Sequence, residues 1–203
     1  MILFKSLTIK NFMSVGNITQ GISFNNDLTL VLGENLDLGA NGSRNGTGKT
    51  TIVNALSYAL YGNALTKIKL GNLINKTNEK GMVVSIEFSK NGIEYKIERG
   101  RKPNILKLFI GDQEIDDSAQ GDNRETQKTI EDIIGLSHEM FKHIIALNTH
   151  TEPFLNMKVA DQRDIIEELL GITILSEKAS VLKELIKDKK DSIRHENFKI
   201  STI

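Results

Sequence analysis

The sequence predicts an α/β fold, and three observations support this prediction. Residues 28–32 form a short apolar run that ends at a glycine, which is typical of a strand covered on both faces. A helical pattern follows over residues 50–60, after a segment rich in glycine and asparagine. Between residues 82 and 110 apolar and polar side chains alternate, which predicts an antiparallel β meander.

The N-terminal part contains short strands, a loop and the first helix. Residues 7–9 and 22–24 alternate apolar and polar side chains, which predicts two strands before the apolar run. Residues 33–48 have the composition of a loop. The helix over 50–60 should end at Gly62, because glycine readily adopts the left-handed conformation that closes many helices.

The meander and the helices after it follow from local signals. Residues 84–88 and 93–97 flank the pair Asn91-Gly92, which favours a two-residue hairpin turn, and a third strand is expected over 105–110. Helices are predicted over 124–134, 137–147 and 161–170. Apolar side chains then recur at coiled-coil spacing, at Leu175, Ala179, Leu182, Ile186 and Ile193. We therefore predict one domain over 1–172 and the start of a coiled coil over 173–203.

Composition excludes several classes of protein. The 203 residues include 26 Lys+Arg and 26 Asp+Glu, so attraction to a polyanion must come from local patches of charge. The chain has no cysteine, which excludes disulfides, thiolate metal sites and cysteine nucleophiles. It has no apolar run long enough to span a bilayer and no secretory signal, so we expect no membrane partner and a cytoplasmic location.

One motif carries chemistry, a glycine-rich loop that leads into the helix over 50–60. The predicted nucleotide-binding residues are Asn45, Gly46, Thr47, Gly48, Lys49, Thr50 and Thr51. Such a loop turns successive amides toward phosphate oxygens, and the helix N-terminus adds its partial positive charge. Lys49 would reach the β and γ phosphates and the Thr50 hydroxyl would ligate Mg²⁺, so ATP and magnesium are the expected cofactors.

The loop departs from the usual P-loop pattern at its first glycine. That position, six residues before Lys49, is Ser43. Gly33 is the alternative first glycine, and it would require an insertion over about residues 35–44. A stretched loop leaves a second hypothesis open, in which the chain is an interaction module with a degenerate P-loop that binds no nucleotide.

Four stretches of the sequence, taken in order, resemble the N-terminal half of the SMC-like DNA repair ATPases, the SbcC group. They are residues 7–12, the split loop of 33–35 and 46–51, residues 56–62, and residues 154–155 with 163–172. More narrowly, the same stretches resemble the ATPase subunits of T-even bacteriophage recombination endonucleases. The resemblance implies an ABC-type ATPase head, of which this chain forms the N-terminal lobe, followed by an antiparallel coiled coil.

The resemblance also implies partners and an activity. The family's Walker B strand and Ser-Gly-Gly segment, neither of which occurs in this sequence, lie in a C-terminal lobe beyond the coiled coil. The implied partners are that lobe, a second ATPase head, an SbcD-like nuclease subunit and double-stranded DNA. The implied function is ATP-dependent control of DNA access to the nuclease, with little ATPase activity in this chain alone. A transporter ATPase is a further alternative, which the coiled coil after Gly171 disfavours.

Two positions differ from the family pattern. Met13 stands where the family has an arginine after Asn-Phe, and Asn148 stands where the family has a metal-binding glutamine. Asn148 is therefore a candidate magnesium ligand with a shorter side chain, or a residue at the end of a helix.

Two basic clusters are candidates for contact with the DNA backbone, with solvated loops as the alternative. The candidate DNA-binding residues are Lys67, Lys69, Arg99, Arg101 and Lys102. His138 and His143 lie on different sides of the predicted helix over 137–147, so we expect them to pack and not to form a metal pair.

Overall fold

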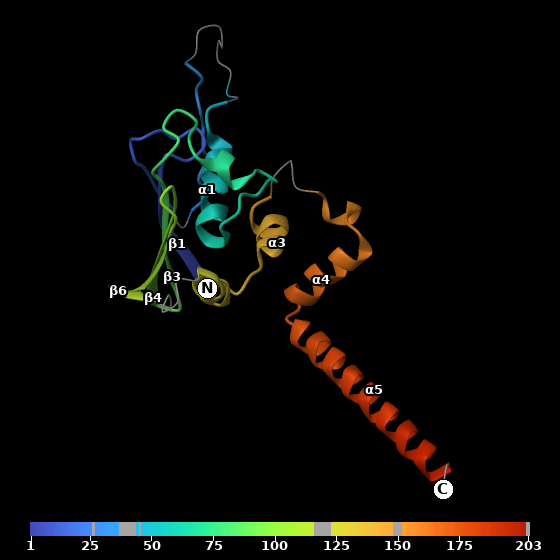
Figure 1. Ribbon diagram of the computed structural model, residues 1–203. Coiled ribbons are helices and arrows are strands. Elements are labelled where there is room, and N and C mark those ends of the chain that lie inside the picture. The colour runs from blue at the N-terminus through green and yellow to red at the C-terminus, as the bar shows by residue number, and fades with distance from the viewer. Residues whose placement is uncertain (26, 37–43, 45, 116–122, 148–151, 202–203) are drawn as a thin grey trace. The chain divides into compact units, whose positions relative to one another are not determined.

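The computed structural model describes residues 1–25, 27–36, 44, 46–115, 123–147 and 152–201. Its contacts divide the chain into two compact units, Met1–Thr151 and Glu152–Ile203. The first unit contains the sheet and the helices α1 and α2, and the second contains α4 and the long helix α5 (Figure 1). The domain boundary between residues 172 and 173 stays a prediction.

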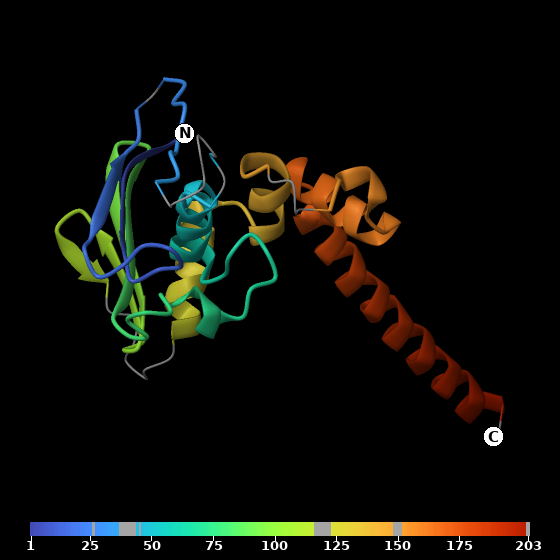
Figure 2. The same cartoon turned by 90° about the horizontal axis from the view of Figure 1, so that it is seen from above.

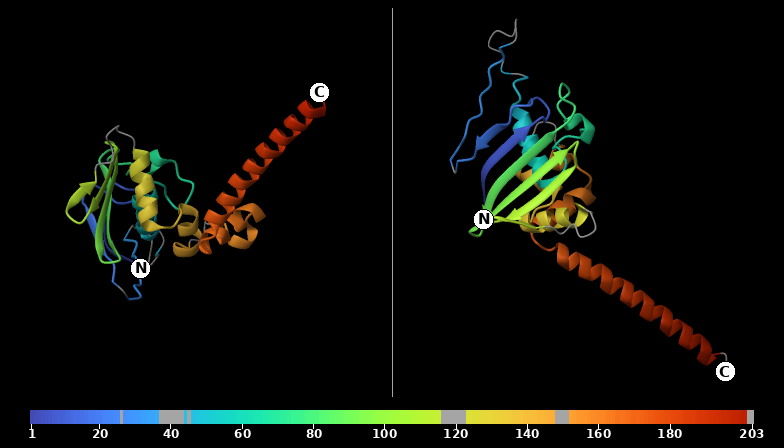
Figure 3. Two further views of the ribbon diagram at one scale, coloured as in Figure 1. Left: turned by 90° about the horizontal axis from the view of Figure 1, so that it is seen from below. Right: turned by 60° about the vertical axis from the view of Figure 1, so that its left-hand side comes forward.

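The first unit is built on one six-stranded sheet in which every neighbouring pair is antiparallel (Figure 3). Its strands are β1 (Ile2–Lys10), β2 (Gln20–Ser23), β3 (Met82–Lys90), β4 (Ile93–Arg101), β5 (Ile105–Ile110) and β6 (Gln113–Ile115). Their order across the sheet is β2-β1-β3-β4-β5-β6. The predicted meander is confirmed, and it continues into the short strand β6.

Helices cover one face of this sheet (Figure 2). Helix α1 (Lys49–Tyr61) contacts β3 and β4, and α2 (Asn123–Ile134) contacts β5 and α1. A short 3₁₀ helix η1 (Leu70–Leu73) follows α1, and α3 (His138–Met140) runs into the π-helical turn η2 (Phe141–Ile145). The single helix predicted over residues 137–147 is thus replaced by two consecutive short helical segments, α3 and η2.

The register of the strands explains which face is buried. Leu7 pairs with Ile86, Ile86 with Ile97, and Ile97 with Leu108, and all four side chains are fully buried. Most of the alternate positions on β3 and β4 carry polar side chains, as expected for a sheet with one solvated face. Buried residues from the helices complete the core, among them Ala55, Ala59, Leu60, Ile130 and Ile134.

The predicted turn signals are confirmed. Asn91 and Gly92 both have positive φ, 54° and 83°, as a two-residue turn between β3 and β4 requires. Gly62 has φ 72° directly after α1, and its N–H donates to the Tyr58 carbonyl at 2.8 Å. The residues next to each position were therefore sufficient to predict the turn between β3 and β4 and the end of α1.

The strand predicted over residues 28–32 is not formed. These residues lie outside every strand, and the side chains of Leu28, Leu30 and Leu32 are 101%, 79% and 64% exposed. A strand buried on both faces needs hydrogen-bonded neighbours, and none of the six described strands pairs with this segment. An apolar run specifies a buried strand only when the neighbouring strands are present.

The second unit consists of three helices along the chain. These are the 3₁₀ helix η3 (Phe154–Asn156), α4 (Val159–Leu169) and α5 (Thr173–Ser201). Helix α5 has 29 residues, and its apolar residues Leu175, Leu182, Ile186 and Ile193 are exposed along it. Within the described part of the chain, no helix has the length and apolar character needed to cross a bilayer.

Candidate nucleotide-binding site

Helix α1 begins directly at the predicted P-loop lysine. Gly48 is the residue before the helix, with φ 81° and ψ 9°, and the helix starts at Lys49. The first turn of α1 contains no acidic residue. The free amide groups and the partial positive charge of the helix N-terminus are therefore not neutralised by a side chain of the same turn. This helix start has the geometry and polarity that an anion requires.

The glycine-rich segment and the distant Gly33 lie together at this helix start. The Lys49 ammonium donates to the Thr47 hydroxyl oxygen at 3.1 Å and to the Arg44 carbonyl. A Cβ added at Gly33 would lie 2.1 Å from Thr47 Oγ1, so only glycine allows the two segments to approach this closely. The fold therefore brings the alternative first glycine to the lysine loop, although the sequence separates them.

The two threonines at the start of α1 have different environments. Thr50 is exposed, whereas Thr51 is 5% exposed and its hydroxyl lies 2.9 Å from that of Ser14. The exposed position of Thr50 is compatible with a Mg²⁺ ligand, and that role stays a prediction. Ser14 was not singled out by the sequence, because its position in the β1–β2 connection gives no signal of this contact.

A network of asparagines holds the β1–β2 connection. Asn11 is buried with φ 50°, and its amide group donates to the carbonyls of Lys80 and Gly81 at 3.0 and 3.2 Å. Its side-chain oxygen accepts from Asn78 at 2.8 Å, and Asn75 donates to the Met13 carbonyl at 3.0 Å. The asparagine of the Asn-Phe pair therefore fixes the backbone that presents Ser14 to α1.

Several predicted site residues lie outside the described residues. These are Asn45 of the loop, the segment 37–43 of the insertion, and Asn148. Among the described residues, no group of three or more His, Cys, Asp or Glu side chains is arranged to hold a metal ion. The roles assigned to Asn45 and Asn148 stay predictions.

Arg99, a predicted DNA-binding residue, has partners within the fold. Its guanidinium donates to the Ala59 carbonyl at 3.2 Å and to the Gln127 side chain, and it lies 5.9 Å from the centre of the Tyr58 ring. Burial lowers the pKa of Arg99 to about 10, so it remains charged at neutral pH. These contacts join α1, α2 and β4, and the contact of Arg99 with DNA stays a prediction.

One cavity lies beside parts of both basic clusters. Leu70, directly after Lys69, lines the same cavity as Arg99 and Arg101. Lys67, Lys69 and Lys102 are exposed. The segment that follows Lys69 and the end of β4 therefore border the same cavity of the first unit.

His138 has the packing role expected for it. The Ser57 hydroxyl donates to the Asn63 carbonyl at 2.8 Å, so its oxygen accepts the N–H of His138 Nε2 at 3.0 Å. The imidazole also lies against Tyr61, with ring centres 5.1 Å apart. Because the serine proton is already donated to Asn63, this pair is not an activated nucleophile.

The environment of His138 predicts a pH dependence of stability. Burial, together with the nearby Lys142, lowers the pKa of His138 below its ordinary value. In the unfolded chain the imidazole binds a proton at a higher pH than in the folded chain. The free energy of unfolding should therefore be highest above about pH 6.5 and should fall as the pH decreases below it.

Urea unfolding measured between pH 7.5 and 5 tests this expectation. His138→Gln, which keeps a donor toward Ser57, should reduce the dependence of unfolding free energy on pH. His195→Gln, at an exposed position on α5, is the control and should leave the dependence unchanged. An equal dependence in His138→Gln and the unaltered chain would contradict the assignment.

Comparisons with known proteins agree with this geometry. The family model described as "AAA domain" matches residues 6–202. The chain is 33% identical over 181 residues to "Exonuclease subunit 2" of Enterobacteria phage T4, which covers 87% of this chain and 30% of that protein. It is 26% identical to "DNA double-strand break repair Rad50 ATPase" of Methanococcus maripaludis, over 91% of this chain and 17% of that protein.

Solved structures show the same fold. An Smc head domain with an extended coiled coil, from Pyrococcus furiosus, superposes with a TM-score of 0.62 and 21% identity, covering 96% of this chain and 48% of that one. The chain spans less than a third of the length of the phage relative. The predicted resemblance to the SbcC group is confirmed by these relatives. The chain therefore belongs to the AAA domain family, with the fold of an SMC-type ATPase head.

Proposed function

We propose that this chain is the ATP-binding part of a subunit of a DNA-end-processing nuclease complex. In this proposal, ATP binding and hydrolysis control the access of DNA to a partner nuclease. The observation that carries the proposal is the start of α1, where the helix begins at Lys49 directly after Gly48 and the Lys49 ammonium contacts the Thr47 hydroxyl of the glycine-rich loop. The names of the relatives, an exonuclease subunit and a DNA double-strand break repair ATPase, support the same function.

The residues at the helix start fit ATP and magnesium. Lys49 would pair with the β and γ phosphates, and the amides of residues 46–50 would donate to their oxygens. The exposed Thr50 hydroxyl would ligate Mg²⁺, an ion that keeps several waters and takes phosphate oxygens as further ligands. Thr51 would act indirectly, because its hydroxyl contacts Ser14.

The exposed apolar residues support the proposed protein partners. Leu28, Leu30 and Leu32 are suited to a buried strand but are exposed, so we propose that a C-terminal ATPase lobe supplies the neighbouring strands. The exposed seam of α5 would pair with the returning helix of an antiparallel coiled coil starting at 173–203, after a head lobe over 1–172. A second head and an SbcD-like nuclease subunit would complete the complex.

Double-stranded DNA is the proposed nucleic-acid partner. The exposed Lys67, Lys69 and Lys102 and the partly exposed Arg101 supply the positive charge that phosphate contacts need. Arg99 would contribute to this region mainly by holding β4 against the helices, since it already has internal hydrogen bonds.

Nucleotide binding by the unaltered chain and by Lys49→Ala tests the proposal. Loss of the ammonium should reduce ATP affinity by about 10- to 100-fold, since a charged hydrogen bond to phosphate is removed. Isothermal titration calorimetry with ATP and magnesium measures this change, and Lys102→Ala, which removes one exposed positive charge, is the control. Equal ATP affinity in Lys49→Ala, or no binding by either chain, would favour the degenerate interaction module.

Hydrolysis tests the dependence on a second lobe. We expect the 203-residue chain to turn over little ATP, because its sequence has no Walker B strand to supply a base and a second metal contact. A phosphate-release rate well above background that disappears in Lys49→Ala would contradict this expectation.

A further inference from the structure

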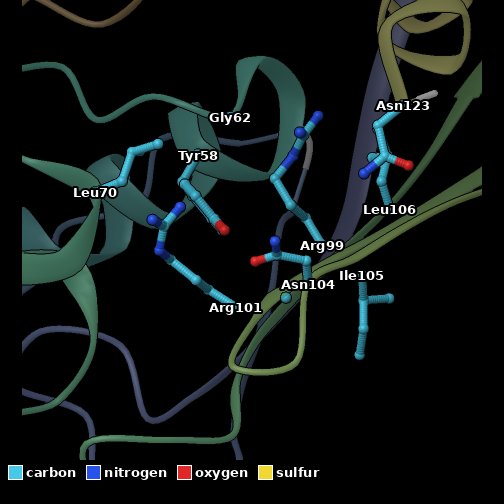
Figure 4. A pocket seen from close by; sticks show the side chains of 10 residues that line it. Tyr58, Gly62, Leu70, Arg99, Arg101, Asn104, Ile105, Leu106 and Asn123 are labelled. Atoms are coloured by element: carbon cyan, nitrogen blue, oxygen red, sulfur yellow. The ribbon is translucent and has the colours of Figure 1, made fainter. Parts of the chain in front are cut away.

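A cavity of about 190 Å³ lies at the opposite end of α1 from Lys49. It is bounded by the end of α1, the start of η1, the end of β4, the start of β5 and the first residue of α2. Figure 4 shows the side chains of Tyr58, Arg101 and Asn104 directed toward one another within it. All its lining residues belong to the first unit.

The cavity is lined by two guanidinium groups, those of Arg99 and Arg101, and of these Arg99 also feels the charge of Glu131. Neither Arg99 nor Arg101 forms an ion pair with a described acidic side chain. Arg99 uses two of its five N–H groups on Ala59 and Gln127, so three remain. The Arg101 guanidinium, which forms no ion pair with a described acidic side chain, favours the entry of an anion into this partly desolvated cavity.

The Tyr58 hydroxyl is a third group without a hydrogen-bond partner among the described residues. Tyr58 is only 3% exposed, with its ring against Phe12 at 5.6 Å between centres, so the hydroxyl has little access to solvent. Burial raises the pKa of Tyr58, opposed by Arg99 and Arg101, so the hydroxyl keeps its proton and can donate. A buried hydroxyl without a partner is destabilising, and an acceptor in the cavity would satisfy it.

We propose that this cavity binds a single phosphate group, as inorganic phosphate or as the terminal phosphate of a DNA strand. The Arg101 guanidinium, the Tyr58 phenol and the Asn104 amide are donors directed toward one another, which suits a tetrahedral oxyanion with several acceptor oxygens, and Arg99 adds positive charge to the same lining. Tyr58 and Gly62 of this site follow Lys49 by nine and thirteen residues, and the site uses none of the nucleotide-loop residues. Phosphate binding here is therefore independent of ATP binding at Lys49.

Titration with inorganic phosphate at constant ionic strength tests the site. The unaltered chain should bind phosphate, and Arg101→Gln should weaken the affinity at least about ten-fold, because a charged donor is lost. Tyr58→Phe keeps the ring and its packing and should also weaken binding. Lys128→Gln removes one positive charge from an exposed position on α2 outside the cavity lining and should leave the affinity unchanged.

The nucleotide loop must be excluded as the source of the signal. Lys49→Ala should keep its affinity for phosphate in the cavity, although it is expected to lose ATP. The proposal is overturned if Arg101→Gln and Tyr58→Phe bind phosphate as the unaltered chain does, if Lys49→Ala alone abolishes binding, or if the unaltered chain does not bind phosphate. Thermal unfolding of each variant establishes that it is folded before titration.

A second measurement distinguishes the two sources of phosphate. Short duplexes of one sequence, with a 5′-phosphate or a 5′-hydroxyl end, are compared for binding to the unaltered chain and to Tyr58→Phe. A preference for the phosphorylated end that Tyr58→Phe removes identifies a DNA terminus as the ligand. Equal binding of both duplexes, with phosphate binding retained, identifies the free ion.

Discussion

Phe88→Ala is expected to destabilise the first unit by about 3–5 kcal/mol, which is a large part of the stability of most small domains. Phe88 is fully buried at the centre of the sheet, on β3. Its ring lies 6.0 Å from that of Phe4 and stacks on Tyr95 at 5.2 Å between centres. Removing it leaves a cavity between three strands, because Phe4 and Tyr95 belong to β1 and β4.

The tyrosines make this unfolding measurable in the whole chain. The chain has no tryptophan, and its three tyrosines, Tyr58, Tyr61 and Tyr95, all lie in the first unit. Tyrosine fluorescence during urea titration therefore reports on that unit alone. Ile93→Ala, at a position on β4 that is 48% exposed, is the control and should change stability by less than about 1 kcal/mol. Comparable losses in the two variants would show that Phe88 is not part of a tightly packed core.

The elements predicted correctly are those specified by neighbouring residues. Asn91-Gly92 determines the turn and register of β3 and β4, and alternation within each strand determines which face is buried. Gly62 determines the end of α1 in the same local way. The run over 28–32 was misassigned because its pattern describes a strand whose neighbours are not among the six strands formed.

The candidate site was predicted in part for a similar reason. Lys49 and Thr50 lie at the start of α1, as the motif requires, and Gly33 lies beside Thr47. Ser14 and Thr51, which are in contact, lie 37 positions apart in the sequence. The spacing of apolar and polar residues predicts helices and strands, but it does not predict a contact between two such distant residues. Arg99 was assigned to a basic cluster from its neighbours in sequence, although its hydrogen bonds lie inside the fold.

Gly48→Ala is expected to reduce ATP affinity by more than about ten-fold and to destabilise the first unit by about 1–3 kcal/mol. Gly48 has φ 81°, a conformation that costs an alanine about 1–2 kcal/mol. An added Cβ would also lie 2.9 Å from Ser14 Oγ. Ser14 could move away only by giving up its 2.9 Å contact with Thr51 Oγ1. The helix start would then shift relative to β1, and the amides around Lys49 would no longer converge.

Gly46→Ala provides a control that separates backbone strain from this steric contact. Gly46 also has positive φ, 75°, but a Cβ added there would have no atom within 4 Å. Both variants carry similar backbone strain, so the difference between them in unfolding free energy and ATP affinity measures the contact with Ser14. We expect Gly48→Ala to lower both ATP affinity and the free energy of unfolding by more than Gly46→Ala does. Titration calorimetry measures the ATP affinity, and urea unfolding measures the stability. Equal effects would mean that Ser14 does not position the start of α1, and that the loop glycines act through conformation alone.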